Sequence, residues 1–200
     1  MLIATFVFAL MNVGVKYVSH IPAIEIIFFR SIVSFIMSGT VLKLQKVNLF
    51  GNNHKILLIR GVAGAIALIM FFITLQKIPL ARAATLMFLS PIFTAILGIW
   101  IVKEKVSPIQ WLFFLLSFGG IVIIQGFDLR ISPLMALLGV GAAFFSGIAY
   151  NMIRKLKTSE HPLVIVFYFP LVTLPIAGVY SIMNWVMPKG IDWVILIGIG

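Results

Sequence analysis

Long runs of apolar residues alternate with short polar and basic segments along almost the whole chain. A helix needs about 20 residues to cross roughly 30 Å of hydrocarbon, so runs of this length predict membrane-spanning helices. Seven runs are long enough and an eighth begins near the last residue: 2–18, 23–42, 56–75, 80–102, 108–125, 134–153, 163–183 and 191–200. The pattern predicts an all-α polytopic membrane protein, truncated here after about seven and a half helices.

The composition supports this class and excludes several others. Hydrophobic residues make up 62% of the chain and charged residues 10%, whereas soluble domains are about half apolar and a quarter charged. The absence of cysteine excludes disulfides, cysteine–zinc sites and thiol catalysis. The net charge of +10 comes largely from loops beside apolar runs, where basic residues match anionic headgroups. We therefore expect a lipid bilayer, and no nucleic acid, as a partner.

Lysine and arginine are unevenly shared between the two sets of alternate loops. Nine lie in the second-to-third, fourth-to-fifth and sixth-to-seventh connections, against five in the others. The nine are Lys43, Lys46, Lys55, Arg60, Lys103, Lys105, Arg154, Lys155 and Lys157. Because cytoplasmic loops carry the basic excess, this set and the N-terminus are predicted to face the cytoplasm, with the protein in the cytoplasmic (inner) membrane.

Proline and capping residues mark the ends of several runs. Ser107 and Gln110 form a capping box at the start of the fifth run. Pro79 follows the third run and predicts a tight turn into the fourth. Pro91 lies inside the fourth run and cannot donate a hydrogen bond to the Met87 carbonyl, so it predicts a kink.

The start of the sixth run is similar to the start of the first, which suggests an internal repeat. At an offset of 138, Thr5, Phe8, Asn12 and Lys16 align with Ala143, Ser146, Tyr150 and Arg154. After a two-residue insertion, Pro22 aligns with Pro162. Five helices separate the two starts, so the second copy enters the membrane from the opposite side. Two inverted repeats are predicted, 1–126 and an incomplete 132–200, which is the arrangement that permits alternating access.

Further motifs lie between residues 60 and 107. They are Arg60-Gly61 at the start of the third helix, the turn Pro79-Leu80-Ala81, Pro91 within the fourth helix, and Glu104 between two lysines, together with FFRSIVSF at 28–35 and FGGIVII at 118–124. In order and spacing these motifs resemble the EamA-like module of the drug/metabolite transporter superfamily. The resemblance implies a ten-helix carrier built as two inverted five-helix repeats, from which this chain departs by ending in the eighth helix.

Arg30 is the leading candidate for a substrate contact. It lies about eight residues inside the second run, which is near the middle of the bilayer at a 1.5 Å rise per residue. A charge at this depth is costly and marks a functional site by default. Arg30 is therefore predicted to bind a substrate carboxylate or phosphate. The alternatives are a structural ion pair with Glu25 and a side chain that extends to the membrane surface.

Other intramembrane polar and aromatic residues complete the candidate site. Phe8, Asn12 and Tyr150 lie on the two aligned stripes, and the alternative for such stripes is hydrogen bonding between helices. The full predicted substrate-binding set is Phe8, Asn12, Arg30, Phe72, Thr85, Phe88, Pro91 and Tyr150. Gly61 and Gly64 predict close packing of the third helix, and Glu104 is expected to be a solvated interfacial charge.

The chemistry available favours transport over catalysis. The five acidic residues are scattered and the three histidines lie in loops, so we expect no catalytic residue, no metal and no cofactor. The sequence predicts a secondary transporter of small organic metabolites or drugs, compatible with a homodimer. An integral-membrane enzyme acting on a lipid or isoprenoid, or a non-transporting assembly partner, are the alternatives. Proton coupling would need a titratable group in the path, and Glu25 is the one carboxylate predicted at membrane depth.

Overall fold

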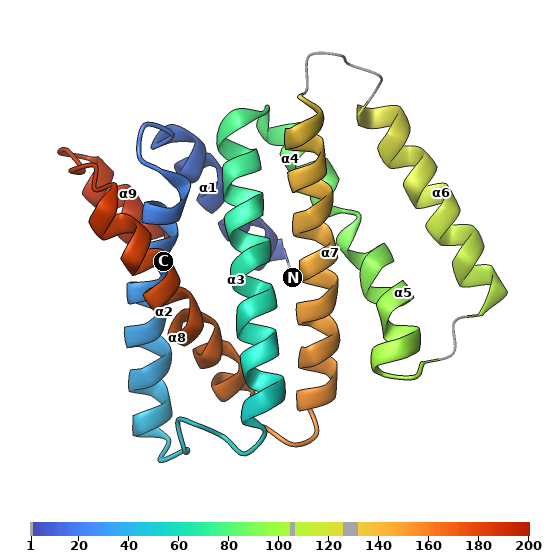
Figure 1. The fold of residues 1–200 in the computed structure, drawn as a ribbon, viewed down its shortest axis with the longest axis horizontal. Coiled ribbons are helices and arrows are strands. Elements are labelled where there is room, and N and C mark those ends of the chain that lie inside the picture. The colour runs from blue at the N-terminus through green and yellow to red at the C-terminus, as the bar shows by residue number, and fades with distance from the viewer. Residues whose placement is uncertain (1, 105–106, 126–131) are drawn as a thin grey trace.

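A computed structural model describes residues 2–104, 107–125 and 132–200, and its regular structure within these ranges is α-helical (Figure 1). The helices are α1 (Leu2–Tyr17), α2 (Ala23–Leu44), α3 (His54–Lys77), α4 (Leu80–Met87), α5 (Ser90–Ile101), α6 (Pro108–Gln125), α7 (Pro133–Leu156), α8 (Pro162–Met183) and α9 (Asp192–Ile199). The prediction of an all-helical polytopic membrane protein is confirmed.

Among the described residues, five helical segments are long and apolar enough to cross a membrane, fewer than the seven predicted. They are α2, α3, the combined segment of α4 and α5, α7 and α8. The first and fifth predicted spans correspond to shorter apolar helices within α1 and α6. In α1 the regular helix ends at Tyr17, because the chain turns over the next residues to reach Pro22 at the head of α2.

The predicted fourth span is broken into two helices. A turn at residues 88–89 separates α4 from α5, and Pro91 lies in the first turn of α5. Because Pro91 has no N–H for the Met87 carbonyl, the helical ladder stops here. The Phe88 amide instead donates to the Thr85 carbonyl at 3.0 Å. The kink predicted at Pro91 is confirmed, in the stronger form of a break.

Helix packing centres on α3. This helix lies against α7 and α8, α2 lies against α8, and α5 lies against α7, while α9 contacts α1 and α2 (Figure 1). A methyl group on Gly61 would lie 2.7 Å from Cγ2 of Val172 and 2.9 Å from the Tyr168 carbonyl oxygen. One on Gly147 would lie 3.0 Å from the Thr94 nitrogen. The prediction that Gly61 permits close packing is confirmed.

Each end of the bundle has its own contact between two loops. At one end, Glu160 Oε1 accepts hydrogen bonds from the Asn52 and Asn53 amides, which ties the α7–α8 turn to the α2–α3 loop. At the other end, His20 Nε2 lies 2.9 Å from Asp192 Oδ2, which ties the α1–α2 turn to the start of α9. Alternate loops therefore lie at opposite ends, as the alternation of helices requires (Figure 1).

The charge count that predicted the orientation needs one correction. Arg60 was counted in the second-to-third connection, but it lies beyond the first turn of α3, whereas Lys43 and Lys55 lie in the terminal turns of α2 and α3 beside the loop. The basic excess on that side is therefore smaller than the sequence count. Lys105 and Arg130, which entered the same count, lie outside the described residues, as does the predicted boundary between the two repeats.

Candidate functional site

One cavity collects side chains from α1, α2, α3, α7 and α8, with the end of α4 beside them. Its volume is about 330 Å³. Two arginines, a tyrosine and two serines line it among aromatic and aliphatic side chains, and the lining includes Phe8, Arg30, Ser34, Arg60, Ser146, Tyr150 and Phe169. Three of the eight predicted site residues, Phe8, Arg30 and Tyr150, therefore meet in one place.

Arg30 lies half-buried in this cavity without a protein acceptor for its buried Nε among the described residues. Its guanidinium carbon lies 5.9 Å from the centre of the Phe72 ring. Glu25, the alternative partner considered from the sequence, is fully buried elsewhere, and its Oε2 accepts a hydrogen bond from the Val186 amide at 3.1 Å. The proposed Glu25–Arg30 ion pair is therefore not formed, and the Arg30 charge faces the cavity.

Arg60 is a second cavity arginine that the sequence analysis missed. Its Nε and Nη1 are buried without a hydrogen-bond acceptor in the described part of the chain. Its guanidinium carbon lies 5.3 Å from the centre of the Phe169 ring on α8. Counting Arg60 as a loop residue hid it, although its position inside the apolar run 56–75 was the signal that could have revealed it.

The remaining predicted residues do not line this cavity. Phe72 is fully buried beneath Arg30, and Asn12 is buried in α1. The Thr85 hydroxyl donates to the Ala81 carbonyl within α4 at 2.7 Å. Phe88 has 66% of its surface exposed.

Pro91 lines a neighbouring cavity of about 350 Å³ together with Thr94 and Arg154. Tyr150 and Ile153 line both cavities. The break between α4 and α5 is thus connected to the two-arginine cavity through Tyr150.

The basic ends of the two predicted polar stripes are structural. Lys16 Nζ donates to the carbonyls of Leu75, Gln76 and Ile78 at 3.2, 3.0 and 3.0 Å, which satisfies the exposed carbonyls at the end of α3. Arg154 Nη1 donates to Glu104 Oε2 at 2.7 Å. Glu104, expected as a solvated charge, is therefore paired, with 48% of its side chain still exposed.

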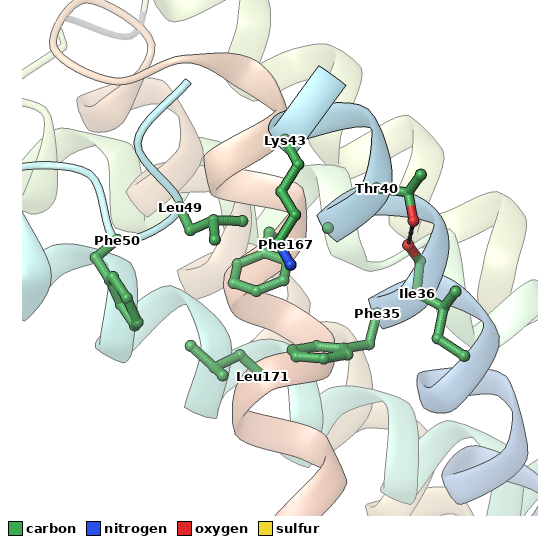
Figure 2. Close-up of a pocket in the computed structure, with 9 residues that line it drawn as sticks. Phe35, Ile36, Thr40, Lys43, Leu49, Phe50, Phe167 and Leu171 are labelled. Atoms are coloured by element: carbon green, nitrogen blue, oxygen red, sulfur yellow. Dashed lines mark hydrogen bonds between the residues drawn. The ribbon is translucent and has the colours of Figure 1, made fainter. Parts of the chain in front are cut away.

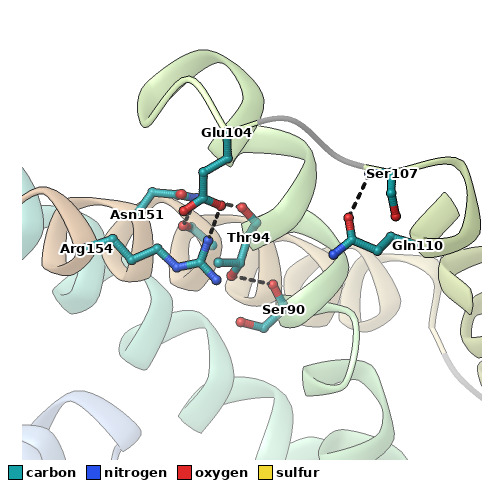
Figure 3. Close-up of polar contacts among 8 residues, drawn as sticks. Ser90, Thr94, Glu104, Ser107, Gln110, Asn151 and Arg154 are labelled. Carbon is teal, nitrogen blue, oxygen red and sulfur yellow. Dashed lines mark hydrogen bonds and ion pairs between the residues drawn. The ribbon is translucent and has the colours of Figure 1, made fainter.

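Polar contacts fasten α5 to α7 beside the cavity (Figure 3). Asn151 Nδ2 on α7 donates to the Thr94 carbonyl on α5 at 2.9 Å, and also to the Gly147 carbonyl at 2.9 Å. The Ser107 amide donates to Gln110 Oε1 at 2.8 Å, which is one half of the predicted capping box. The α5–α7 pair therefore has a specific polar connection in addition to its close packing.

A separate groove lies between α2 and α8 and has different chemistry. Its volume is about 340 Å³, and aromatic and aliphatic side chains including Phe35, Phe167 and Leu171 line it (Figure 2). Lys43 is the charged residue in this lining, and none of the predicted site residues is present. The two-arginine cavity is therefore the better candidate for a polar solute.

The fold and this cavity define a multi-pass membrane protein with a cationic chamber between its helices. A model of the EamA-like transporter family matches residues 1–126. The chain belongs to this family, within the drug/metabolite transporter superfamily.

Similar proteins extend across most of the chain. The pseudopaline exporter CntI of Pseudomonas aeruginosa is 32% identical over 201 residues, which cover 99% of this chain and 71% of CntI. Human solute carrier family 35 member G1 is 28% identical, over 100% of this chain and 60% of its own length. A protein crystal structure at 16% identity superposes with a TM-score of 0.65, covering 98% of this chain and 73% of the other, and shows the fold alone.

Proposed function

We propose that this protein is a secondary carrier that moves small organic metabolites or drugs across the cytoplasmic (inner) membrane by alternating access. The observation that carries the proposal is Arg30, whose charge faces a cavity between helices without a protein counter-ion among the described residues. A charge at membrane depth is costly, and an unpaired buried charge more so. A ligand that pairs with Arg30 during each transport cycle accounts for its presence.

The substrate contacts proposed from this geometry are fewer than those predicted. Phe8, Arg30 and Tyr150 line the cavity and would touch the solute. Phe72 supports Arg30 from below through its ring face. Asn12, Thr85 and Phe88 have no place in this lining, and Pro91 would shape the path through the neighbouring cavity.

Two inverted repeats, 1–126 and 132–200, are proposed as the parts that exchange conformations. Helix contacts support this pairing, because α3 packs on α7 and α8 while α9 packs on α1 and α2. A methyl group on Gly61 would lie 2.7 Å from Val172 Cγ2, and one on Gly200 would lie 2.5 Å from Val33 Cβ. Residues 61 and 200 are 139 positions apart, as are residues 33 and 172, which is within one residue of the offset of 140 that aligns Pro22 with Pro162.

The loop contacts support the same relationship. Glu160 lies two residues before Pro162 and contacts the start of α3. His20 lies two residues before Pro22 and contacts Asp192 at the start of α9. In each case, the turn before the second helix of one proposed repeat (α2 or α8) contacts the start of the third helix of the other repeat (α9 or α3).

The decisive experiment measures solute uptake by the purified protein reconstituted in sealed vesicles. We expect uptake to need a sealed compartment, and Arg30→Gln to reduce it at least tenfold while the amount of folded protein is unchanged. Lys43→Gln, which removes a charge from the same helix outside the cavity, should have little effect. Unchanged uptake by Arg30→Gln would contradict the site, and chemical turnover in detergent would favour a membrane enzyme.

A further inference from the structure

We infer that the transported solute is an organic anion with two acidic groups, one bound by Arg30 and the other by Arg60. The inference rests on the proposed carrier function and specifies the substrate class of the same cavity. Its basis is that two guanidinium groups from neighbouring helices, α2 and α3, line the same two-arginine cavity, here also called the chamber.

The charge of the chamber is not balanced by its own walls. Among the described residues that line it, Arg30 and Arg60 are charged and none is acidic. Walls of low polarity focus the field of such charges and attract ions of opposite sign. Two like charges also repel each other more strongly in a protein interior than in water. A solute with two negative charges balances the chamber, whereas a solute with one leaves an excess positive charge.

The two arginines also carry hydrogen-bond donors that have no protein acceptor among the described residues. Arg30 Nε, Arg60 Nε and Arg60 Nη1 are buried without a partner in the described structure. A buried donor without an acceptor costs about 1–3 kcal/mol, and more when the group is charged. Carboxylate oxygens accept from guanidinium groups in paired, planar geometry. Two acidic groups on one solute would pair with the guanidinium groups of both helices at once.

Aromatic rings orient both guanidinium groups. Arg60 lies over Phe169 at 5.3 Å and Arg30 lies over Phe72 at 5.9 Å. A ring against one face of a guanidinium leaves the N–H groups along its edge available for hydrogen bonds. Each arginine is therefore oriented by a ring contact that leaves its N–H groups free to bind a ligand. Such preorganisation is expected of a binding residue.

The lining between the two arginines suits a carbon skeleton. Apolar and aromatic side chains such as Phe8, Leu68 and Phe71 occupy it, and Tyr150 adds a hydroxyl group. Its volume of about 330 Å³ is at the lower end of the roughly 300–1,000 Å³ found for small-molecule sites. The chamber therefore fits a metabolite with an acid at each end better than an inorganic ion.

The test uses ligands that lose one charge at a time without changing shape. Purified full-length protein is titrated with the linear dicarboxylates from malonate to suberate, and with the monoamide and diamide of each. Affinity is measured as the ligand-dependent rise in thermal midpoint, which grows with ligand concentration relative to the dissociation constant. At the preferred chain length, we expect the dicarboxylate to bind at least tenfold tighter than its monoamide and the diamide to bind negligibly.

Two variants assign the charges to residues. Arg60→Gln should make the dicarboxylate and its monoamide bind equally, because only Arg30 remains to pair with an acid. Arg30→Gln should do the same. Lys55→Gln and Lys77→Gln remove exposed charges from the helix that carries Arg60 and should leave the tenfold preference unchanged.

The outcomes separate this inference from the proposed function. If no dicarboxylate of any length binds tighter than its monoamide to the unmodified protein, the two-acid inference is wrong. If phenyl phosphate binds tighter than every dicarboxylate, both arginines hold a single group and the inference is again wrong. In either case, uptake of another solute by sealed vesicles would leave the carrier function standing. Failure to transport any solute would instead contradict the carrier function itself.

Discussion

Glu160 Oε1 accepts a hydrogen bond of 2.6 Å from the amide of Asn53, the residue that precedes α3. It also accepts one of 2.8 Å from Asn52. The Asn53 side chain does not cap its own helix, and a carboxylate 107 residues away accepts from the two loop amides that directly precede α3. This contact joins two loops at one end of the bundle.

Glu160→Ala is expected to lower the stability of the folded protein by about 2 kcal/mol, since two amides lose a charged acceptor. Thermal unfolding of the purified protein measures the loss. Glu104→Ala is the control, because its ion pair with Arg154 is about half exposed and such pairs are worth roughly 0–1 kcal/mol. Equal effects of the two variants would contradict a stabilising role for this loop contact.

Gly147→Ala is expected to destabilise the protein by about 1–3 kcal/mol, because the added methyl group would press on the α5 backbone. It would lie 2.9 Å from Cβ of Phe93 and 3.0 Å from the Thr94 nitrogen. Gly119→Ala on α6 is the matched control, since a methyl group there meets no atom within 4 Å. Comparable midpoints for both variants in a thermal unfolding assay would argue against close packing of α5 on α7.

Arg60→Met is expected to raise the thermal midpoint of the ligand-free protein while abolishing tight binding of dianions. The reason is that removing an unneutralised buried charge relieves a cost that the empty chamber carries. Lys77→Met, at the exposed end of the same helix, should leave both properties near those of the unmodified protein. A lower midpoint for Arg60→Met would indicate that Arg60 serves the fold and not the solute.

Single cysteines placed at Lys46, Lys103 and Lys157 test the orientation. All three side chains are exposed, and these 200 residues contain no cysteine to interfere. Because basic loops stay in the cytoplasm, we expect no labelling by a membrane-impermeant thiol reagent in intact cells. A cysteine at Lys189, in the loop between α8 and α9, should be labelled. The reverse pattern would overturn the proposed orientation.

The features predictable from sequence are those set by residues close together in the chain. The length of each apolar run set the helices, and Pro91 set the break because its missing N–H is a local property. Arg30 was found because a charge stands out in an apolar run. The roles of these residues in a shared cavity were beyond a linear pattern, which contains no information on which helices are neighbours.

Arg60 and Lys16 show two ways in which the sequence pattern was misleading: Arg60 was missed as a cavity residue, and Lys16 on the predicted polar stripe proved structural. Arg60 lies near a helix end in sequence, which resembles an interfacial charge, yet α8 covers it with Phe169. Lys16 lies on the same predicted stripe as Phe8, yet its side chain donates hydrogen bonds to carbonyls at the end of α3. The role of each residue depends on a neighbouring helix, α8 for Arg60 and α3 for Lys16. The sequence around each residue does not show which helix lies beside it.

The break at residues 88–89 divides the fourth span into two helices, α4 and α5, that pack against different partners. On one side, α5 packs chiefly on α7 and is joined to it by the hydrogen bond from Asn151 to the Thr94 carbonyl. On the other side, α4 is divided among α1, α3, α6 and α7 and ends at Met87, whose side chain lines the two-arginine chamber. A solute bound in that chamber would therefore touch the residue at which α4 ends, directly before the break.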